Sequence, residues 1–165
     1  HILDWCGGWG RIAIPLAKWY RGRHKVTVLD FSAIYLQEAK RYAKEAGVEI
    51  STICADFRRT PPHIQADYAV NCFTAGIGYL GEDEDIVALR SLWEAIKPGG
   101  KILIDTANLF RRIKNQNDMS WDISPDGTKR YLQKRTFDFW TNTQTENNLY
   151  QDVQTGSGEP VRLEL

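Results

Sequence analysis

Acidic and amide side chains stand at the ends of four short apolar segments. These residues are Asp4, Asp30, Asp56 and Asn71. A single aspartate at a strand end is most often a helix cap, but three in succession on neighbouring parallel strands would meet at one edge of a sheet. Open parallel sheets bind their ligands outside the carboxyl ends of the strands. The sequence therefore predicts a ligand site at that edge, with carboxylates available to accept hydrogen bonds from hydroxyls or amines.

A glycine-rich stretch follows the first aspartate. Residues 4–10 read Asp-Trp-Cys-Gly-Gly-Trp-Gly, and apolar residues at helical spacing begin directly after them. Glycine permits tight turns and the close approach of a ligand to bare backbone, while a helix start presents unpaired N–H groups and a positive dipole end. The stretch is therefore predicted to cradle a small molecule. A tight strand–helix turn without a ligand is the structural alternative.

The spacing of the acids favours a nucleoside ligand. Asp30 lies 22 positions after Gly8, which suits a carboxylate that accepts both ribose hydroxyls of a nucleoside lying over the glycine stretch. Asp56 can accept from the exocyclic amine of adenine, and Phe31 and Phe57 offer apolar walls to the base or belong to the core.

Residues 8–13 also satisfy the G-x-G-x-x-A dinucleotide pattern, so NAD is one candidate ligand. Asp4, however, would repel a pyrophosphate and attract an ammonium group. A ligand with an amino-acid tail and an adenosine head, S-adenosylmethionine, satisfies every position.

Alternating strands and helices position these residues. Strands are predicted to end at Asp4 and to span 25–30, 48–54, 67–73 and 101–106. Helices are predicted from about residue 12, over 34–46 with Ser32 as N-cap and Gly47 as terminator, and from the acidic run 82–85 to a stop at Pro98. This order indicates a parallel sheet with crossover helices. After a polar stretch from Asn108, the runs 131–140, 149–153 and 161–165, joined by turn-rich segments 141–148 and 156–160, predict an antiparallel meander.

Composition narrows the function classes. The 165 residues fit one domain, and 21 Lys and Arg balance 21 Asp and Glu, so no overall basic field draws the chain to nucleic acid or to a membrane. The cysteines at 6, 54 and 72 resemble neither a disulfide framework nor a metal site, which favours a reduced, cytoplasmic protein. We see no signal peptide or transmembrane run.

The acidic run 82–85 is interpreted as a helix-capping cluster rather than a metal site. Because the glycine stretch begins at residue 4 without a preceding Met, we expect that an N-terminal part is absent or that the sequence is a fragment.

From Ile2 to about Asn108 the chain resembles the class I S-adenosylmethionine-dependent methyltransferases of the small-molecule type. The matching motifs are residues 3–11, 28–32, 55–57, 67–73 with 78–79, and 92–100. The resemblance implies an α/β fold: a Rossmann-like doubly wound sheet of parallel strands, here with an antiparallel β insertion after the fifth strand. We expect residues 1–108 to bind S-adenosylmethionine and residues 109–165 to form a β extension that covers the substrate and is a candidate surface for a homodimer.

The resemblance also implies roles for individual residues. Gly8 and Gly10 would lie beside the methionine part of the cofactor, and Asp30 would bind its ribose. Asp56 and the Phe57 N–H would hold adenine, and Asn71 would lie near the methionine amine and sulfonium. The full expected cofactor-binding set is Asp4, Cys6, Gly8, Gly10, Asp30, Phe31, Asp56, Phe57, Asn71 and Phe73.

Two positions depart from the family pattern. Cys6 replaces the first of the usual three glycines, which predicts a tighter or shifted loop. Pro15 falls inside the first helix, where it is expected to remove a hydrogen bond and kink the helix.

The predicted reaction is in-line transfer of a methyl group to a small molecule. It needs reactants held at near-attack distance, and a general base only if the nucleophile arrives protonated. Tyr79 is the one catalytic candidate, because its ring would favour a cationic sulfonium, although packing beneath its loop explains it equally well. His24 and His63 are expected at the surface. An NAD-dependent oxidoreductase and a non-catalytic nucleoside-binding domain are the alternative functions.

Overall fold

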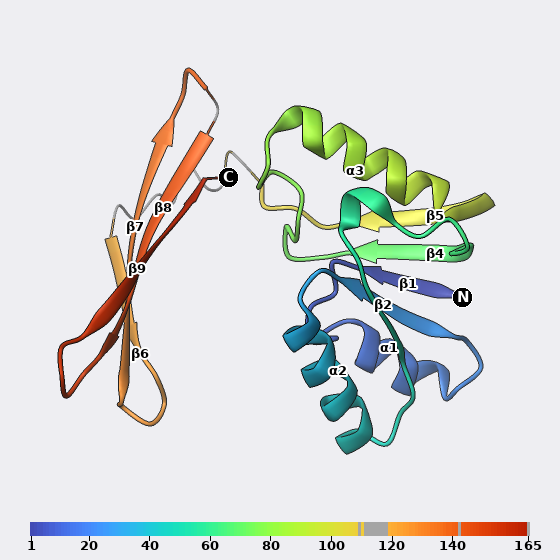
Figure 1. The fold of residues 1–165 in the computed structure, drawn as a ribbon, viewed down its shortest axis with the longest axis horizontal. Helices are drawn as coiled ribbons and strands as arrows, with labels where there is room; N and C mark the ends of the chain where they lie inside the picture. The colour runs from blue at the N-terminus through green and yellow to red at the C-terminus, as the bar shows by residue number, and fades with distance from the viewer. Residues whose placement is uncertain (109, 111–118, 142, 165) are drawn as a thin grey trace. The chain divides into compact units, whose positions relative to one another are not determined.

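The computed structural model describes residues 1–108, 110, 119–141 and 143–164 (Figure 1). It divides into two compact units, residues 1–106 and 107–165. None of the helices in these ranges is long and apolar enough to cross a membrane.

The first unit is built on a parallel five-stranded sheet in the order β3-β2-β1-β4-β5. The chain runs from β1 outward through β2 to β3 and then returns to β4 on the other side of β1. This reversal creates a switch point at the carboxyl ends of β1 and β4, where the ligand of such a sheet is expected. The strands are β1 (Ile2–Trp5), β2 (Val26–Asp30), β3 (Ser51–Cys54), β4 (Ala66–Asn71) and β5 (Ile96–Ile104).

Helices cover both faces of this sheet, because the buried side chains of β1 and β2 point alternately to two separate cores. Leu3 and Trp5 pack with Leu92 in one core, and Ile2 and Val28 belong to the other. Helices α1 and α2 share the second core, and α3 contributes to the first (Figure 1). The predicted doubly wound α/β fold is therefore confirmed. The helices are α1 (Ala13–Tyr20), α2 (Ala33–Glu45) and α3 (Glu82–Glu94), with a short 3-10 helix η1 (Phe57–Arg59).

The predicted helix signals near α2 and α3 are confirmed. Ser32 caps α2 by accepting a hydrogen bond of 3.3 Å from the Tyr35 N–H, and Gly47 follows the helix with a φ of +68°. All four acids of residues 82–85 lie in the first turn of α3, where the helix dipole favours negative charge. One of them, Asp85, also accepts from the Gly78 N–H at 2.9 Å and so fixes the preceding loop.

One prediction about proline was wrong, and the other holds in part. Pro15 is the third residue of α1, and the N–H groups of Ile14 and Leu16 on either side of it donate to the carbonyls of Gly10 and Ile12, four residues earlier. Because Pro15 has no N–H, it interrupts this series of hydrogen bonds at one place, as predicted, and the kink stays a prediction. Pro98 does not separate α3 from the next strand: residues 98–100 already belong to β5, which starts at Ile96 and shifts register against β4 between Ala66 and Tyr68.

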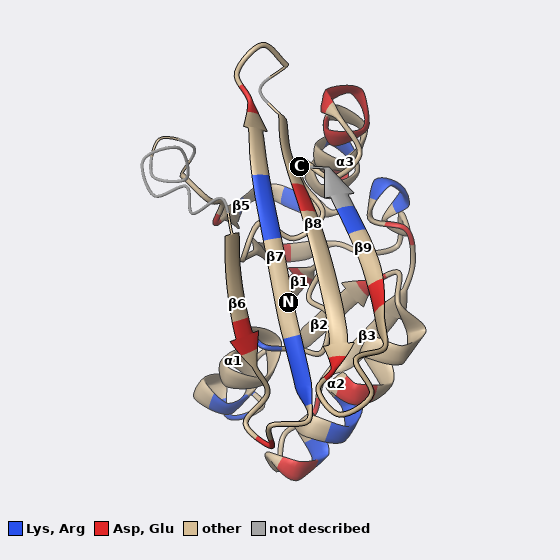
Figure 2. Cartoon of the chain, turned by 90° about the vertical axis from the view of Figure 1, so that its left-hand side faces the viewer, with Lys and Arg blue, Asp and Glu red and all other residues tan. Residues whose placement is uncertain are grey.

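The second unit is an antiparallel sheet in the order β6-β7-β8-β9, which confirms the predicted meander. Two parts of it were not predicted: β6 lies in the polar stretch after Asn108, and the first half of β8 was assigned to a turn. Its strands carry charges of both signs (Figure 2). The predicted run 161–165 ends at Leu165, which is outside the described residues. The strands are β6 (Met119–Ile123), β7 (Lys129–Asp138), β8 (Thr143–Asp152) and β9 (Gly158–Glu164).

A polar network joins one face of β7 to the same face of β8. Glu146 accepts from Gln133 and Gln144, and from Arg135 at 3.0 Å. The Tyr131 hydroxyl accepts from Gln133 and donates to Asn148, at 2.7 and 2.9 Å. Hydrogen bonds between side chains thus hold the middle of this sheet where an apolar ladder is the commoner arrangement.

Candidate functional site

Two strand-end carboxylates organise the loop between β1 and α1. Asp4 Oδ2 accepts from the Ala13 N–H at 2.9 Å, and Asp30 Oδ2 accepts from the Gly8 N–H at 2.9 Å. The second oxygen of Asp30 accepts from the Ser32 N–H, also at 2.9 Å. The carboxyl ends of β1 and β2 are therefore tied to the glycine loop and to the start of the next helix. Asp30 and Gly8 lie together as the sequence spacing predicts.

The conformation of the loop explains its glycines. Gly8 and Gly10 have φ values of +54° and +82°, which glycine adopts without strain. Gly7 is required for space, because a Cβ at this position would stand 2.5 Å from Cγ of Asp4. Cys6 has a φ of +59°, so a residue with a side chain occupies the left-handed conformation here. The departure at Cys6 is therefore a strained position within the loop.

A cavity of about 200 Å³ opens beside this loop. Four of its lining residues belong to the expected cofactor-binding set: Asp4, Cys6, Gly8 and Phe73. The remaining lining residues come from the glycine loop, the first turn of α2 and the loop after β4; they are Gly7, Trp9, Arg11, Ile12, Tyr35, Cys72 and Ala75. The cavity thus lies at the switch point between β1 and β4.

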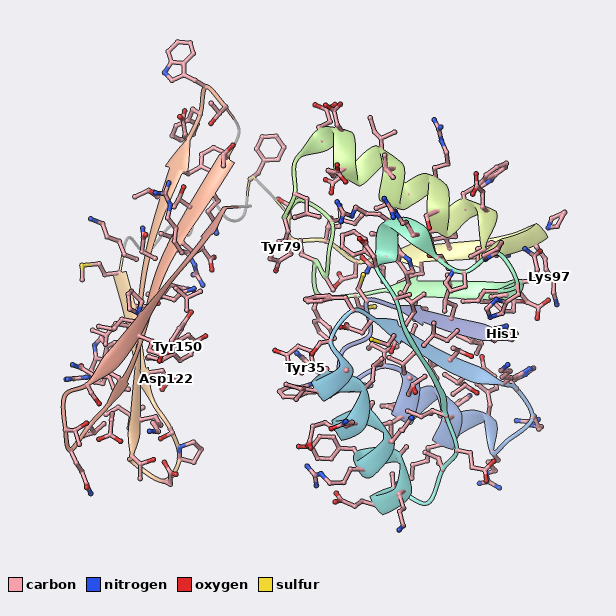
Figure 3. The ribbon with its side chains drawn as sticks, viewed as in Figure 1. His1, Tyr35, Tyr79, Lys97, Asp122 and Tyr150 are labelled. Carbon is pink, nitrogen blue, oxygen red and sulfur yellow. The ribbon has the colours of Figure 1, made fainter. Side chains whose placement is uncertain are left out.

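Aromatic rings and one guanidinium group distinguish this cavity from a plain turn. The guanidinium carbon of Arg11 stands 4.0 Å from the centre of the Phe73 ring, and the rings of Trp9 and Tyr35 are 6.0 Å apart. Figure 3 shows Tyr35 and Tyr79 at the end of the first unit toward which its strands point, and His1 and Lys97 at the opposite end. The aromatic faces can attract a cation, and the guanidinium can pair with a carboxylate.

Sequence reasoning missed Trp9, Arg11 and Tyr35. Trp9 and Arg11 stand within the glycine stretch, so their positions were visible but their direction was not. Tyr35 had a clearer signal, because it is the third residue after the Ser32 cap and follows the strand-end Asp30. The first turn of a helix after a strand-end acid is where a site residue could have been sought.

Asp56 makes different contacts from those of Asp4 and Asp30. It caps η1 by accepting from the Arg58 N–H at 2.9 Å, and its carboxylate pairs with the Arg58 guanidinium at 2.6 Å. Arg58 also pairs with Glu84 at 2.7 Å. The hydrogen bonds from Arg58 lower the pKa of Asp56. Asp56 does not line the cavity, and an adenine amine there would share its carboxylate with Arg58.

The two phenylalanines that were expected to flank the base, Phe31 and Phe57, lie in different surroundings. The Phe57 ring meets the Trp5 ring edge to face at 5.4 Å and packs against the core beneath α3. Phe31 is 72% exposed. Neither side chain lines the cavity, and neither does Gly10, whose added Cβ would stand 3.2 Å from Ile14.

Asn71 is fully buried at the carboxyl end of β4. Its Nδ2 donates to the carbonyls of Trp5 and Ala75, each at 2.9 Å, and so joins β1 to the loop after β4. Its Oδ1 is buried without a hydrogen-bond partner among the described residues. An unpaired buried acceptor is costly, and it is an available position for a donor from a ligand.

Tyr79, the catalytic candidate, lies in the loop after β4 and is 40% exposed, but it does not line the cavity. His24 packs edge to face on Tyr20, with ring centres 4.5 Å apart, and both His24 and His63 are exposed, as expected. Within the described ranges no group of three or more His, Cys, Asp or Glu side chains could hold a metal ion.

Burial sets the electrostatics of the cavity wall. It raises the pKa of Asp4 to about 7, against the opposing hydrogen bond from Ala13, and the neighbouring Asp30 raises it further. Burial also raises the pKa of the Cys6 thiol, with the carboxylates of Asp30 and Asp4 adding to the effect. Cys6 is therefore a neutral thiol at pH 7 and not an activated nucleophile.

Both the sequence and the fold of this chain are similar to those of known proteins. Residues 2–100 match the family model described as "Methyltransferase domain". A ubiquinone/menaquinone biosynthesis C-methyltransferase, UbiE, from Photorhabdus laumondii is 27% identical over 106 residues, which are 63% of this chain and 41% of that protein.

Two solved structures align with 99% of this chain, and the aligned part is 64% of each of their own chains. An S-adenosylmethionine-dependent methyltransferase from Clostridium acetobutylicum aligns with a TM-score of 0.76 at 15% identity. The sugar N-methyltransferase KedS8 from Streptoalloteichus aligns with a TM-score of 0.72 at 16% identity. At these identities the structures show a shared fold.

Proposed function

This chain belongs to the class I S-adenosylmethionine-dependent methyltransferases, and from that premise we propose that it transfers a methyl group to a small-molecule acceptor by in-line displacement. The chain spans 41% of the length of the curated relative and 64% of the solved structures named above. The family match weighs against the NAD-dependent oxidoreductase alternative. The observation that carries the proposal is the hydrogen bond from Gly8 to Asp30, because it brings a strand-end carboxylate against the glycine loop at the switch point.

The residues around the cavity fit the methionine end of S-adenosylmethionine. Asp4 and the unpaired Oδ1 of Asn71 are acceptors suited to an ammonium group, and Arg11 is a donor suited to a carboxylate. The bound cofactor would supply a methyl group on a sulfonium. The rings of Trp9 and Tyr35 would favour that cation.

The adenosine end is assigned to residues outside the cavity. Each oxygen of Asp30 accepts one backbone N–H and keeps further acceptor capacity, so the carboxylate can also accept ribose hydroxyls. Asp56 and the Phe57 N–H are the proposed adenine contacts, with Phe31 as an exposed wall. These roles are supported by the sheet order, in which β2 lies next to β1 and β3 lies next to β2.

The protein's own contribution to the reaction is positioning. Asp4 and Asp30 fix the glycine loop from below, and Asn71 fixes the loop after β4, so both walls of the cavity are held before any ligand arrives. Such preorganised walls keep nucleophile and methyl group at near-attack distance, about 3–3.5 Å, and exclude water. We assign no general base, and Tyr79 stays a candidate for contact with the methyl group.

The acceptor class is inferred from the named relatives. One is described as a C-methyltransferase of ubiquinone and menaquinone biosynthesis and another as a sugar N-methyltransferase, so both act on small molecules. We propose that residues 109–165 cover such an acceptor; residues 109, 111–118, 142 and 165 of this segment lie outside the described ranges. A homodimer through this segment stays a prediction.

Thermal unfolding with S-adenosylhomocysteine tests the cofactor site. At about 100 times the Kd, a ligand that binds only the folded state raises Tm by roughly 5–10 °C for a chain of this size. Asp30→Ala should abolish the rise, while Asp122→Ala, which removes an exposed carboxylate on β6, should keep it. An unchanged Tm of the unaltered protein at millimolar ligand would refute the proposal.

Transfer of a labelled methyl group from S-adenosylmethionine to a panel of sugars, amines and quinol precursors tests the reaction. Label in any acceptor supports a methyltransferase. Binding of S-adenosylhomocysteine without transfer to any acceptor would instead favour the non-catalytic nucleoside-binding domain. Enhanced NADH fluorescence on mixing would favour the oxidoreductase.

A further inference from the structure

A second and larger cavity lies at the opposite end of the first sheet. Its volume is about 590 Å³, within the range of small-molecule sites. It opens where β2 and β3 begin and where α2 ends, so it is separated from the glycine loop by the length of the strands. Its lining residues come from the segment before β2 and its first residue, the second half of α2, and the segment that leads into β3.

The floor of this cavity is apolar. Val26 and Ala43 are 2% and 3% exposed, and Val48 and Ile50 pack against the same core from the segment before β3. A ligand that reached this floor would exchange water for apolar contacts. The floor therefore suits the apolar body of a small molecule.

The rim is cationic. Lys25, Lys40 and Lys44 line the cavity with a single carboxylate, Glu49, so their combined formal charge is +2 with His24 neutral. The whole chain has a formal net charge of zero, so this rim is a local excess. Figure 2 colours the cationic residues along α2 blue.

The acids of α2 do not neutralise these lysines. Glu38 and Glu45 both pair with Arg41, at 2.5 and 2.6 Å. Across the described ranges, none of the three lysines at the rim forms an ion pair. Three ammonium groups are thus available at one opening.

Without a counter-ion, the close spacing of these lysines is unfavourable. Lys40 and Lys44 are four residues apart on one helix face, where like charges repel. Lys44 has a structural role as the cation of the last helical turn, which complements the helix dipole. Lys40 and Lys25 have no such role, so they are the informative residues.

We propose that this cavity binds a small molecule that carries a phosphate monoester on an apolar body. Such a phosphate has a charge of about −1.5 to −2 at pH 7 and several acceptor oxygens, which match the excess charge of the rim. The apolar body would lie against Val48 and Ile50, the partly buried side chains of the floor. This cavity is distinct from the one at the glycine loop, because the two share no lining residue.

Phenyl phosphate is the probe. In methyl NMR spectra of the protein, it should shift the signals of Val26, Ala43, Val48 and Ile50 in a saturable way. Lys40→Gln and Lys25→Gln should each raise the Kd about tenfold or more, because each removes a charge-assisted contact. Lys101→Gln, which removes an exposed lysine on β5, should leave the Kd unchanged. Added salt should weaken binding to the unaltered protein.

Four outcomes would overturn the proposal. The first is no shift of the floor signals by phenyl phosphate. The second is equal weakening by Lys40→Gln and Lys101→Gln, which would indicate non-specific attraction to surface charge. The third is equal affinity for phenol and phenyl phosphate, which would remove the anion from the recognition. The fourth is binding of inorganic phosphate as tightly as phenyl phosphate, which would remove the apolar body from the recognition. Amide spectra of each variant check that it is folded.

Discussion

Asp4→Asn is the most informative single substitution in the site, because Asp4 is a buried acid that holds the glycine loop. It is 2% exposed and accepts from the Ala13 N–H at 2.9 Å. Burial raises its pKa from 3.8 to about 7, which means that the folded protein keeps a proton that the unfolded chain releases. Asparagine has nearly the same shape and retains an oxygen for Ala13, but it does not titrate.

The direction of the pH effect follows from the number of protons bound at Asp4 in the folded and the unfolded state. Between pH 4 and pH 7 the unfolded chain binds fewer protons at Asp4 than the folded protein does, so the contribution of Asp4 to the free energy of unfolding falls as the pH rises. This contribution is undiminished below pH 4 and levels off above pH 7. One pKa unit corresponds to about 1.36 kcal/mol, so Asp4 alone removes on the order of 4 kcal/mol across this range. Asp4→Asn should match the unaltered protein near pH 4 and be the more stable of the two at pH 8.

Urea unfolding followed by tryptophan fluorescence at several pH values between 4 and 8 measures the difference. Asp122→Asn, at an exposed carboxylate on β6, is the matched control and should follow the unaltered protein. Parallel stability curves for Asp4→Asn and the unaltered protein would refute the reasoning. If the proposed ammonium contact exists, binding of S-adenosylhomocysteine should also tighten from pH 5 to pH 8 in the unaltered protein and not in Asp4→Asn.

Three further substitutions test contacts in and around the site by urea unfolding. Gly7→Ala should lower the free energy of unfolding by about 2–4 kcal/mol, because its Cβ would displace the Asp4 carboxylate, and an equal loss in an Asp4→Ala background would contradict that cause. Asn71→Leu should cost about 2–4 kcal/mol by leaving two buried carbonyls without donors, and a neutral effect would show that water replaces them. Arg58→Ala should cost less than about 1 kcal/mol, because its pairs, including the one with Glu84, are partly exposed; the loss should shrink in high salt, and a larger, salt-independent loss would contradict this.

The parallel core was predictable because most of its strands are short apolar runs, four of which are closed or closely followed by an acid or an amide. The second sheet was only partly predictable. Residues 143–148 read Thr-Gln-Thr-Glu-Asn-Asn, so neither face of this half of β8 carries an apolar residue. Its strand structure depends on pairing with β7 and on bonds such as those from Gln133 to Glu146. Period-two hydrophobicity, the usual signal, is absent there.

The candidate site was likewise predictable only in part. The sequence spacing correctly brought Asp30 to Gly8 because strand ends in a parallel sheet meet at one edge. It could not show that Trp9 and Arg11 line the cavity, since their directions depend on backbone angles such as the φ of +59° at Cys6. Nor could it show that Arg58, two residues away, would occupy the carboxylate of Asp56.

Cys6 and Gly76 link the two loops of the switch point. A Cβ at Gly76 would stand 2.9 Å from the Cys6 sulfur, and the two residues come from different loops. Position 76 is therefore restricted to glycine in two ways, by this contact and by its φ of +80°, which glycine adopts without strain. Glycine at position 6 would remove only the first restriction. The substitution that makes Cys6 unusual thus constrains a residue seventy positions further along the chain.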